Sequence, residues 1–105
     1  MKYIFEIKIK SGHSLDEYVE SWKAGSAVIQ KYPGANGTRL YKKIGEPEKL
    51  LAIADWESKK LRDQAMKSLS ESDSETQKIW KAHGEYGDIT KIGEFDETGW
   101  EVISG

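Results

Sequence analysis

The chain has 105 residues, of which 37% are hydrophobic and 32% charged, and its 16 basic and 18 acidic side chains give a net charge of −2. This near balance excludes the basic surface typical of nucleic-acid-binding proteins. The absence of cysteine excludes disulfides and Cys-ligated metals and suits a cytoplasmic protein. The length predicts a single domain over residues 1–105. We expect neither a signal peptide nor a membrane span, since no apolar run approaches ~18 residues.

The first predicted elements are a strand and a helix. Apolar residues alternate with mostly polar ones near the N-terminus, which indicates a strand with one buried face: Tyr3, Phe5, Ile7 and Ile9. Ser14 and Glu17 are spaced as a capping box, so a helix begins between them. Its apolar residues recur every three or four positions until Pro33-Gly34 ends it. Gly25 costs about 1 kcal/mol in a helix interior, and we expect close approach to the sheet to compensate.

Two strands and a second helix follow. Residues 38–44 and 50–56 are predicted to form a hairpin, joined by the turn at 45–48. The apolar run at 50–54 indicates a strand that is covered on both faces. Alternation places Ala52, Ala54 and Trp56 on one face together with Leu50, where the two alanines leave room for a packed helix or a bound ligand. Ser58 is the predicted N-cap of a helix over residues 59–69.

The last third of the chain predicts a surface loop at 70–74, a short helix and two strands. Ser72 and Glu75 fit a capping box, and the helix is expected to end at His83, with Gly84 as its stop. Residues 89–95 form the fourth predicted strand. A short last strand is expected at 100–103, where Trp100 should dock on the sheet or on a partner subunit, because a final Trp is rarely left in water.

The element order β-α-β-β-α-β predicts a ferredoxin-like α+β sandwich with an extra short helix and a short C-terminal strand. In that fold the helices cover one face of the sheet. The other face would carry Ile4, Leu51 and Ile53 among charged side chains. A half-apolar bare face favours a homodimer that buries sheet against sheet.

The strand-ending segment Ala54-Asp55-Trp56-Glu57-Ser58, with Pro33-Gly34, Leu40-Tyr41 and Pro47, resembles the antibiotic biosynthesis monooxygenase-like family of the dimeric α+β barrel superfamily. The resemblance implies a barrel formed by two sheets across a dimer and a cleft between sheet and helices that Trp56 lines. Members of this family include cofactor-free oxygenases of polycyclic aromatics, small quinol monooxygenases and haem-degrading enzymes.

The haem branch of the family pairs the Trp with an asparagine on the first strand and with a histidine roughly ten residues later. This chain has Phe5 and Met66 near those positions, so haem degradation is disfavoured. Two separated histidines give no metal-ligand spacing, and no phosphate-binding loop is present. We therefore expect no cofactor and no metal. The oxygenase branch often uses polar residues of strands 2 and 3, for which the candidates are Arg39, Tyr41 and Asp55.

The candidate site residues are His83 and Trp56 as catalytic residues, and Tyr18, Trp22, Phe5, Tyr3 and Trp80 as substrate-binding residues. Each has a structural alternative: the aromatic residues as ordinary core, and His83 as a partner of the helix dipole. Two functions remain open. One is a cofactor-independent monooxygenase acting on a small aromatic or quinol-type substrate; the other is a non-catalytic dimeric domain, binding a small ligand or related to stress, that uses the same cleft.

Overall fold

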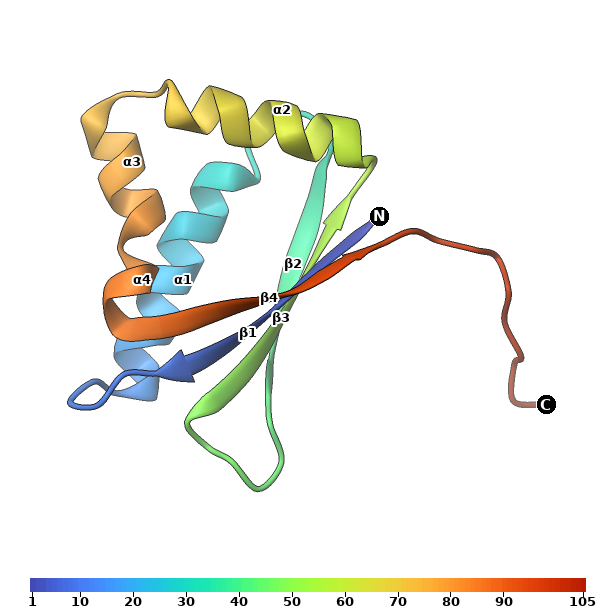
Figure 1. Cartoon of the computed structure of the whole chain (residues 1–105), viewed down its shortest axis with the longest axis horizontal. Coiled ribbons are helices and arrows are strands. Elements are labelled where there is room, and N and C mark those ends of the chain that lie inside the picture. Colours follow the sequence, from blue (N-terminus) through green and yellow to red (C-terminus); the bar gives the residue numbers. More distant parts are fainter.

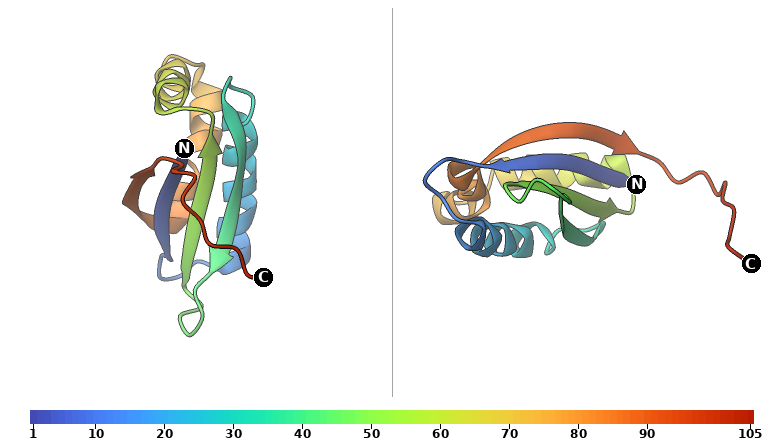
Figure 2. Two further views of the ribbon diagram at one scale, coloured as in Figure 1. Left: turned by 90° about the vertical axis from the view of Figure 1, so that its right-hand side faces the viewer. Right: turned by 90° about the horizontal axis from the view of Figure 1, so that it is seen from below.

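A computed structural model describes all residues, 1–105. The elements are β1 (Lys2–Ile9), α1 (Leu15–Ile29), β2 (Ala35–Lys42), β3 (Lys49–Trp56), α2 (Lys59–Ser70), α3 (Ser74–Lys81), α4 (His83–Tyr86) and β4 (Gly87–Phe95). The strands form one antiparallel sheet in the order β2-β3-β1-β4, with the helices on one of its faces (Figures 1 and 2). The predicted ferredoxin-like α+β sandwich and its extra helix are therefore confirmed.

Cross-strand pairing sets the row of side chains that lies beneath the helices. Ala54 pairs with Tyr3 of β1 and with Thr38 of β2, and Ala52 pairs with Phe5. Paired residues point to the same face of a sheet, so two small methyl groups lie between larger side chains on the face that the helices cover. The predicted alternation along β3 is confirmed by its buried residues: Leu50, Ala52 and Trp56.

The predicted starts of α1 and α2 are confirmed by their caps. Ser14 Oγ accepts a hydrogen bond from the Glu17 backbone N–H, and the Glu17 carboxylate accepts one from Ser14 N–H. Ser58 caps α2 by accepting from Leu61 N–H. The expected role of Gly25 is corrected, since a Cβ there would lie 3.4 Å from the Trp80 carbonyl oxygen. Gly25 thus allows close approach of α1 to α3 rather than to the sheet.

The core is divided into two clusters of buried side chains. One gathers around the start of β1 and helix α2: Met1, Ile29, Trp56, Ala65 and Leu69. The other packs the middle of the sheet against the first half of α1: Ile7, Tyr18, Leu50 and Ala52. Residues between the two clusters are only partly buried, among them Tyr3, Phe5 and Trp22. The fold therefore leaves incomplete packing at the junction of the two clusters.

Two predicted helix boundaries in the last third are wrong. Asp73, not Ser72, caps α3, because its carboxylate accepts a hydrogen bond from Thr76 N–H at 2.7 Å. Gly84 does not end a helix, because it lies inside the short helix α4. The turn into β4 occurs at Gly87, where a Cβ would approach the Ile7 side chain to 2.6 Å. Only glycine fits at position 87, because any side chain there would overlap the buried side chain of Ile7.

The second strand begins at Ala35, three residues before its predicted start. The pairing of β2 with β3 is irregular between Ala35 and Thr38. Gly37 lies in that interval with φ +99°, a conformation that favours glycine. The Asn36-Gly37 pair therefore marks an irregularity within the strand rather than a turn that precedes it.

The predicted C-terminal strand is absent. Residues 96–105 contain no regular element and project away from the body of the chain (Figures 1 and 2). Trp100, Val102 and Ile103 are 87%, 101% and 78% exposed. The register explains this, because Phe95 pairs with Lys2 and the chain beyond it has run past the start of β1. Docking of Trp100 on a partner subunit stays a prediction.

The sheet face opposite the helices has no cover. Ile4, Leu51 and Ile53 lie there half-buried, and ion pairs flank them, including Lys2 with Asp55. The structure thus carries the half-apolar bare face that the sequence predicted.

None of the helices combines the length and apolar character that a membrane crossing requires.

Candidate functional site

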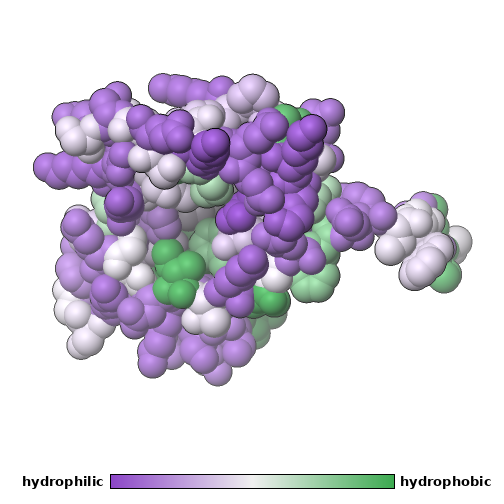
Figure 3. All heavy atoms as spheres, turned by 45° about the horizontal axis from the view of Figure 1, so that its top comes forward, coloured by the Kyte–Doolittle hydropathy of each residue, from purple (hydrophilic) through white to green (hydrophobic).

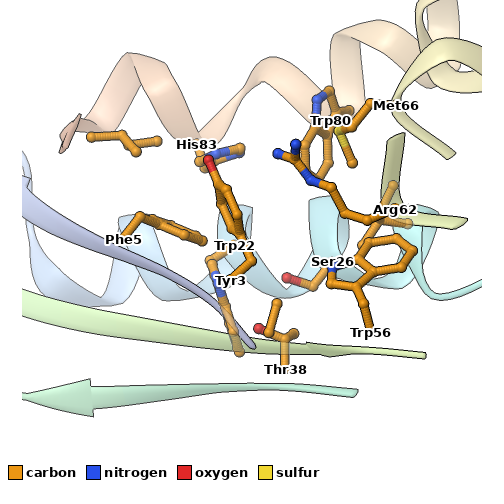
Figure 4. A pocket seen from close by; sticks show the side chains of 13 residues that line it. Tyr3, Phe5, Trp22, Ser26, Thr38, Trp56, Arg62, Met66, Trp80 and His83 are labelled. Atoms are coloured by element: carbon orange, nitrogen blue, oxygen red, sulfur yellow. The ribbon is translucent and has the colours of Figure 1, made fainter. Parts of the chain in front are cut away.

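A cavity of about 160 Å³ lies between the sheet and the helices, and nine of its thirteen lining residues are hydrophobic. Its lining includes side chains from every strand and every helix: Tyr3 and Phe5 (β1), Thr38 (β2), Ala54 and Trp56 (β3), Ile89 (β4), Trp22, Ser26 and Ile29 (α1), Arg62 and Met66 (α2), Trp80 (α3), and His83 (α4). Figure 4 shows most of these side chains. On the molecular surface, a hollow with paler and green side chains interrupts the otherwise polar covering (Figure 3).

Six of the seven predicted site residues line this cavity: His83, Trp56, Trp22, Phe5, Tyr3 and Trp80. Of the two alanines of β3, Ala54 forms part of the cavity floor between Tyr3 and Thr38, whereas Ala52 is fully buried in the core cluster of Ile7, Tyr18 and Leu50. Trp56 belongs to a core cluster, where it is 5% exposed, and its ring also borders the cavity.

The placement of Tyr18 differs from the prediction. Tyr18 is fully buried with Ile7 and Leu50 and does not line the cavity. Its hydroxyl has no hydrogen-bond partner, and burial raises the pKa of this phenol well above its usual value. Its ring meets the His83 ring edge to face, with centroids 6.3 Å apart. Tyr18 therefore supports the side of His83 from within the core.

His83 is the imidazole of the cavity. It is half-buried at the start of α4 and packs edge to face against Trp80. Burial lowers the pKa of this imidazole, and a backbone group of Trp80 raises it to a lesser extent. A lowered pKa leaves the ring neutral near pH 7, so one of its nitrogens can accept a proton from a bound group. The other histidine, His13, lies in the turn before α1 beside Glu17.

The sequence interpretation missed Arg62, which brings a permanent positive charge to the cavity wall. Its guanidinium carbon lies 4.2 Å from the centroid of the Tyr3 ring, which is a cation–π distance. The sequence spacing could have indicated this position, because Arg62 precedes Met66 by four residues and therefore lies on the same face of α2. Met66 packs against the core cluster of Trp56 and also lines the cavity.

Two hydroxyl residues of the lining were also missed, Ser26 and Thr38. Thr38 Oγ1 donates a hydrogen bond to the Ile53 carbonyl at 3.4 Å. Ser26 follows the small residue Gly25 on α1, in the segment that approaches α3 closely. Both residues look like ordinary helix and strand positions in the sequence, so nothing there marked them as lining.

The three polar candidates of strands 2 and 3 point away from the cavity. Arg39 pairs with Ile53 and Tyr41 with Leu51, and these partners lie on the bare face of the sheet. Asp55 is on that face as well, in an ion pair with Lys2. Nowhere do three or more His, Asp or Glu side chains gather as metal ligands would.

No protein-family profile matches this sequence, and no curated protein matches it. Solved structures do match. A point mutant of SnoaB, a cofactor-independent oxygenase from Streptomyces nogalater, aligns with a TM-score of 0.74 and 13% identity over 95% of this chain and 96% of that chain. A putative antibiotic biosynthesis monooxygenase from Bordetella bronchiseptica aligns with a TM-score of 0.64 and 15% identity over 90% and 95% of the two chains.

A conserved protein from Methanosarcina mazei Go1 has a TM-score of 0.63 and 16% identity, with 87% of this chain and 88% of that chain covered. At such identities the comparisons show a common fold. The chain has the fold of structures described as a cofactor-independent oxygenase and as a putative antibiotic biosynthesis monooxygenase, which is the fold that the segment around Trp56 predicted.

Proposed function

We propose that the protein is a cofactor-independent monooxygenase of the antibiotic biosynthesis monooxygenase-like family and that it oxidises a phenol or hydroquinone with a single ring. The observation that carries this proposal is one half-buried imidazole, with a lowered pKa, in an apolar cavity walled by aromatic rings. The similarity in fold to described oxygenases supports it.

The size of the cavity favours a ligand with one ring. Its volume is about 160 Å³, and an engineered apolar cavity of about 150 Å³ in another protein holds benzene. Tyr3, Phe5 and Trp22 offer ring faces and edges to such a ligand, and aromatic pairs gain free energy beyond the area that they bury. A polycyclic substrate would require the cavity to open further.

The chemistry needs one proton acceptor and a site that excludes water. Neutral His83 takes the proton of a ring hydroxyl, and the resulting phenolate is electron-rich enough to reduce O₂. With hydroquinone the balance is C₆H₆O₂ + O₂ → C₆H₄O₃ + H₂O. The O–O bond and one ring C–H bond break: one oxygen atom forms a new bond to that ring carbon and the other leaves as water, so the ring loses four electrons and O₂ gains four. The departing oxygen takes up two protons, the hydroxyl proton returned by His83 and the proton of the broken C–H bond.

A second candidate is a non-catalytic domain that binds a small aromatic ligand in the same cavity. One observation favours it: no carboxylate lines the cavity, so His83 lacks the acidic partner that orients many catalytic histidines. Both functions need the same cavity. They differ only in whether bound phenol reacts with oxygen.

Oxygen uptake distinguishes the two functions. Purified protein is mixed with hydroquinone in an oxygen electrode, and the wild type is compared with His83→Ala and with the control His13→Ala. The oxygenase predicts uptake by the wild type and by His13→Ala and its loss in His83→Ala. If the wild type binds hydroquinone in a calorimeter and takes up no oxygen above the uncatalysed rate, the binding domain is the better assignment.

A further inference from the structure

Three cations surround one carboxylate between α2 and β4, next to the part of the cavity wall that Arg62 forms. Glu94 lies 3.5 Å from the Lys59 ammonium, 3.6 Å from Arg62 Nη1 and 3.1 Å from the Lys91 ammonium. Asp63 adds a second carboxylate, 2.8 Å from Lys59 and 3.6 Å from Arg62. Three positive charges thus face two negative ones, and these contacts lower the pKa of both Glu94 and Asp63. The cluster keeps one positive charge in excess.

Arg62 is the cation of this cluster that lines the cavity. Its side chain is 18% exposed, whereas Lys59 and Lys91 are 60% and 53% exposed. Both carboxylate oxygens nearest to Arg62 are 3.6 Å away, beyond the usual hydrogen-bond range of about 2.7–3.2 Å. Each lysine, by contrast, has a carboxylate oxygen within 3.1 Å. A guanidinium that is largely removed from water is stabilised by direct hydrogen bonds, and Arg62 makes none to these two carboxylates.

Tyr3 connects this cation to the imidazole. The Arg62 guanidinium lies over the Tyr3 ring at 4.2 Å, and Figure 4 shows the Tyr3 side chain extending from β1 with its hydroxyl directed toward His83. The cavity therefore has a cation and a proton acceptor on its helix side and aromatic rings between them. A ligand that matches both groups carries an anionic group and a hydroxyl on one ring.

We propose that Arg62 binds the carboxylate of the ligand, so that the preferred ligands are phenolic carboxylic acids with one ring rather than neutral phenols. The guanidinium can form two parallel hydrogen bonds with a carboxylate, and the excess positive charge of the cluster adds a longer-range attraction. His83 then faces the ring hydroxyl. This inference rests on the aromatic cavity of the proposed function and adds the class of ligand.

The test is a comparison of two ligands that differ only in a carboxylate, hydroquinone and 2,5-dihydroxybenzoate, by titration calorimetry at low salt. Wild-type protein should bind the acid about tenfold more tightly or better, as expected for charge-assisted hydrogen bonds. Arg62→Gln should lose this preference and bind the two ligands about equally. Arg62→Lys should keep part of it. Lys60→Gln is the matched control, because Lys60 is an exposed cation of α2 that does not line the cavity.

Equal affinity of the wild type for both ligands, binding of neither at millimolar concentration, or a preference that survives in Arg62→Gln would overturn the inference. Oxygen uptake separates it from the oxygenase proposal. A preference for the acid that depends on Arg62 without any oxygen uptake supports the inference and counts against the oxygenase. Oxygen uptake with hydroquinone and no preference for the acid supports the oxygenase and overturns the inference.

Discussion

The imidazole of His83 meets the indole of Trp80 nearly edge to face, with ring centroids 5.5 Å apart and an interplanar angle of 68°. This contact joins α3 to α4 across a single residue, Ala82. It also shields the imidazole from water on one side, while Tyr18 shields another. The pKa of His83 is lowered mainly because of this burial. Because its pKa then differs between the folded and the unfolded chain, the free energy of unfolding should depend on pH.

Stability should depend on pH through His83. Its pKa in the folded chain lies below the ordinary value of 6.5, so the unfolded chain takes up this proton first as the pH falls. The free energy of unfolding contributed by His83 is therefore complete above about pH 6.5 and is lost as the pH falls toward the folded pKa. Denaturant titrations from about pH 7 to about pH 5 should show a steeper loss for the wild type than for His83→Gln. Parallel curves would contradict this.

Replacement of Trp56 should affect both folding and binding. Trp56→Ala is expected to lower the free energy of unfolding by about 3–5 kcal/mol and also to weaken the binding of hydroquinone. Leu69→Ala is the matched control, since Leu69 belongs to the same core cluster and does not line the cavity. It should lower stability by about 2–5 kcal/mol and leave binding unchanged in protein that is still folded. Equal losses of affinity in the two variants would mean that Trp56 acts only as core.

Gly87 and Gly84 should respond differently to alanine. At Gly87 a Cβ would come within 2.6 Å of the Ile7 side chain and 3.0 Å of the Tyr18 ring, whereas nothing lies within 4 Å of one at Gly84. Overpacking of this kind costs about 1–3 kcal/mol, so Gly87→Ala should lower the melting temperature. Gly84→Ala should leave the melting temperature unchanged or raise it, because alanine is the better helix former. A melting temperature of Gly87→Ala equal to that of the wild type would show that the core adjusts freely.

The bare sheet face should form a homodimer interface. Light scattering after size exclusion at micromolar concentration should give twice the mass of one chain. Ile53→Lys places a charge at the centre of the half-apolar face and should yield a monomer, since an unpaired buried charge is unfavourable. Ile79→Lys, a change of the same kind on α3, should leave the dimer intact. A wild-type mass of one chain would refute the interface.

The chain end should contribute to that dimer. A truncation after Glu97 keeps the ion pairs of Glu97 with Lys2 and the N-terminal amino group and removes the exposed residues Trp100, Val102 and Ile103. We expect it to raise the dissociation constant of the dimer in analytical ultracentrifugation, because these side chains are predicted to bury apolar area on the partner subunit. A dissociation constant and melting temperature equal to those of the full chain would refute this role.

Local patterns in the sequence determined much of the fold. The alternation from Tyr3 to Ile9, the apolar run ending at Trp56 and the capping box of Ser14 and Glu17 all depend on neighbours within a few residues. The small side chains at Ala52 and Ala54 indicated the space beside Trp56. These features depend on the period of a strand or a helix and on hydrogen bonds within one turn, so no knowledge of distant segments was needed.

The tertiary structure decided what distant segments do to each other. Tyr18 and Trp22 lie one turn apart on α1, yet only Trp22 reaches the cavity, because Gly87 of β4 lets the chain pass directly over Tyr18. Arg62 belongs to the site because β1 brings Tyr3 beneath it. Trp100 lacks a strand partner because β4 has already reached the start of β1 at Phe95. Each outcome depends on register and close approach between elements far apart in the chain, and spacing within a single element does not encode these.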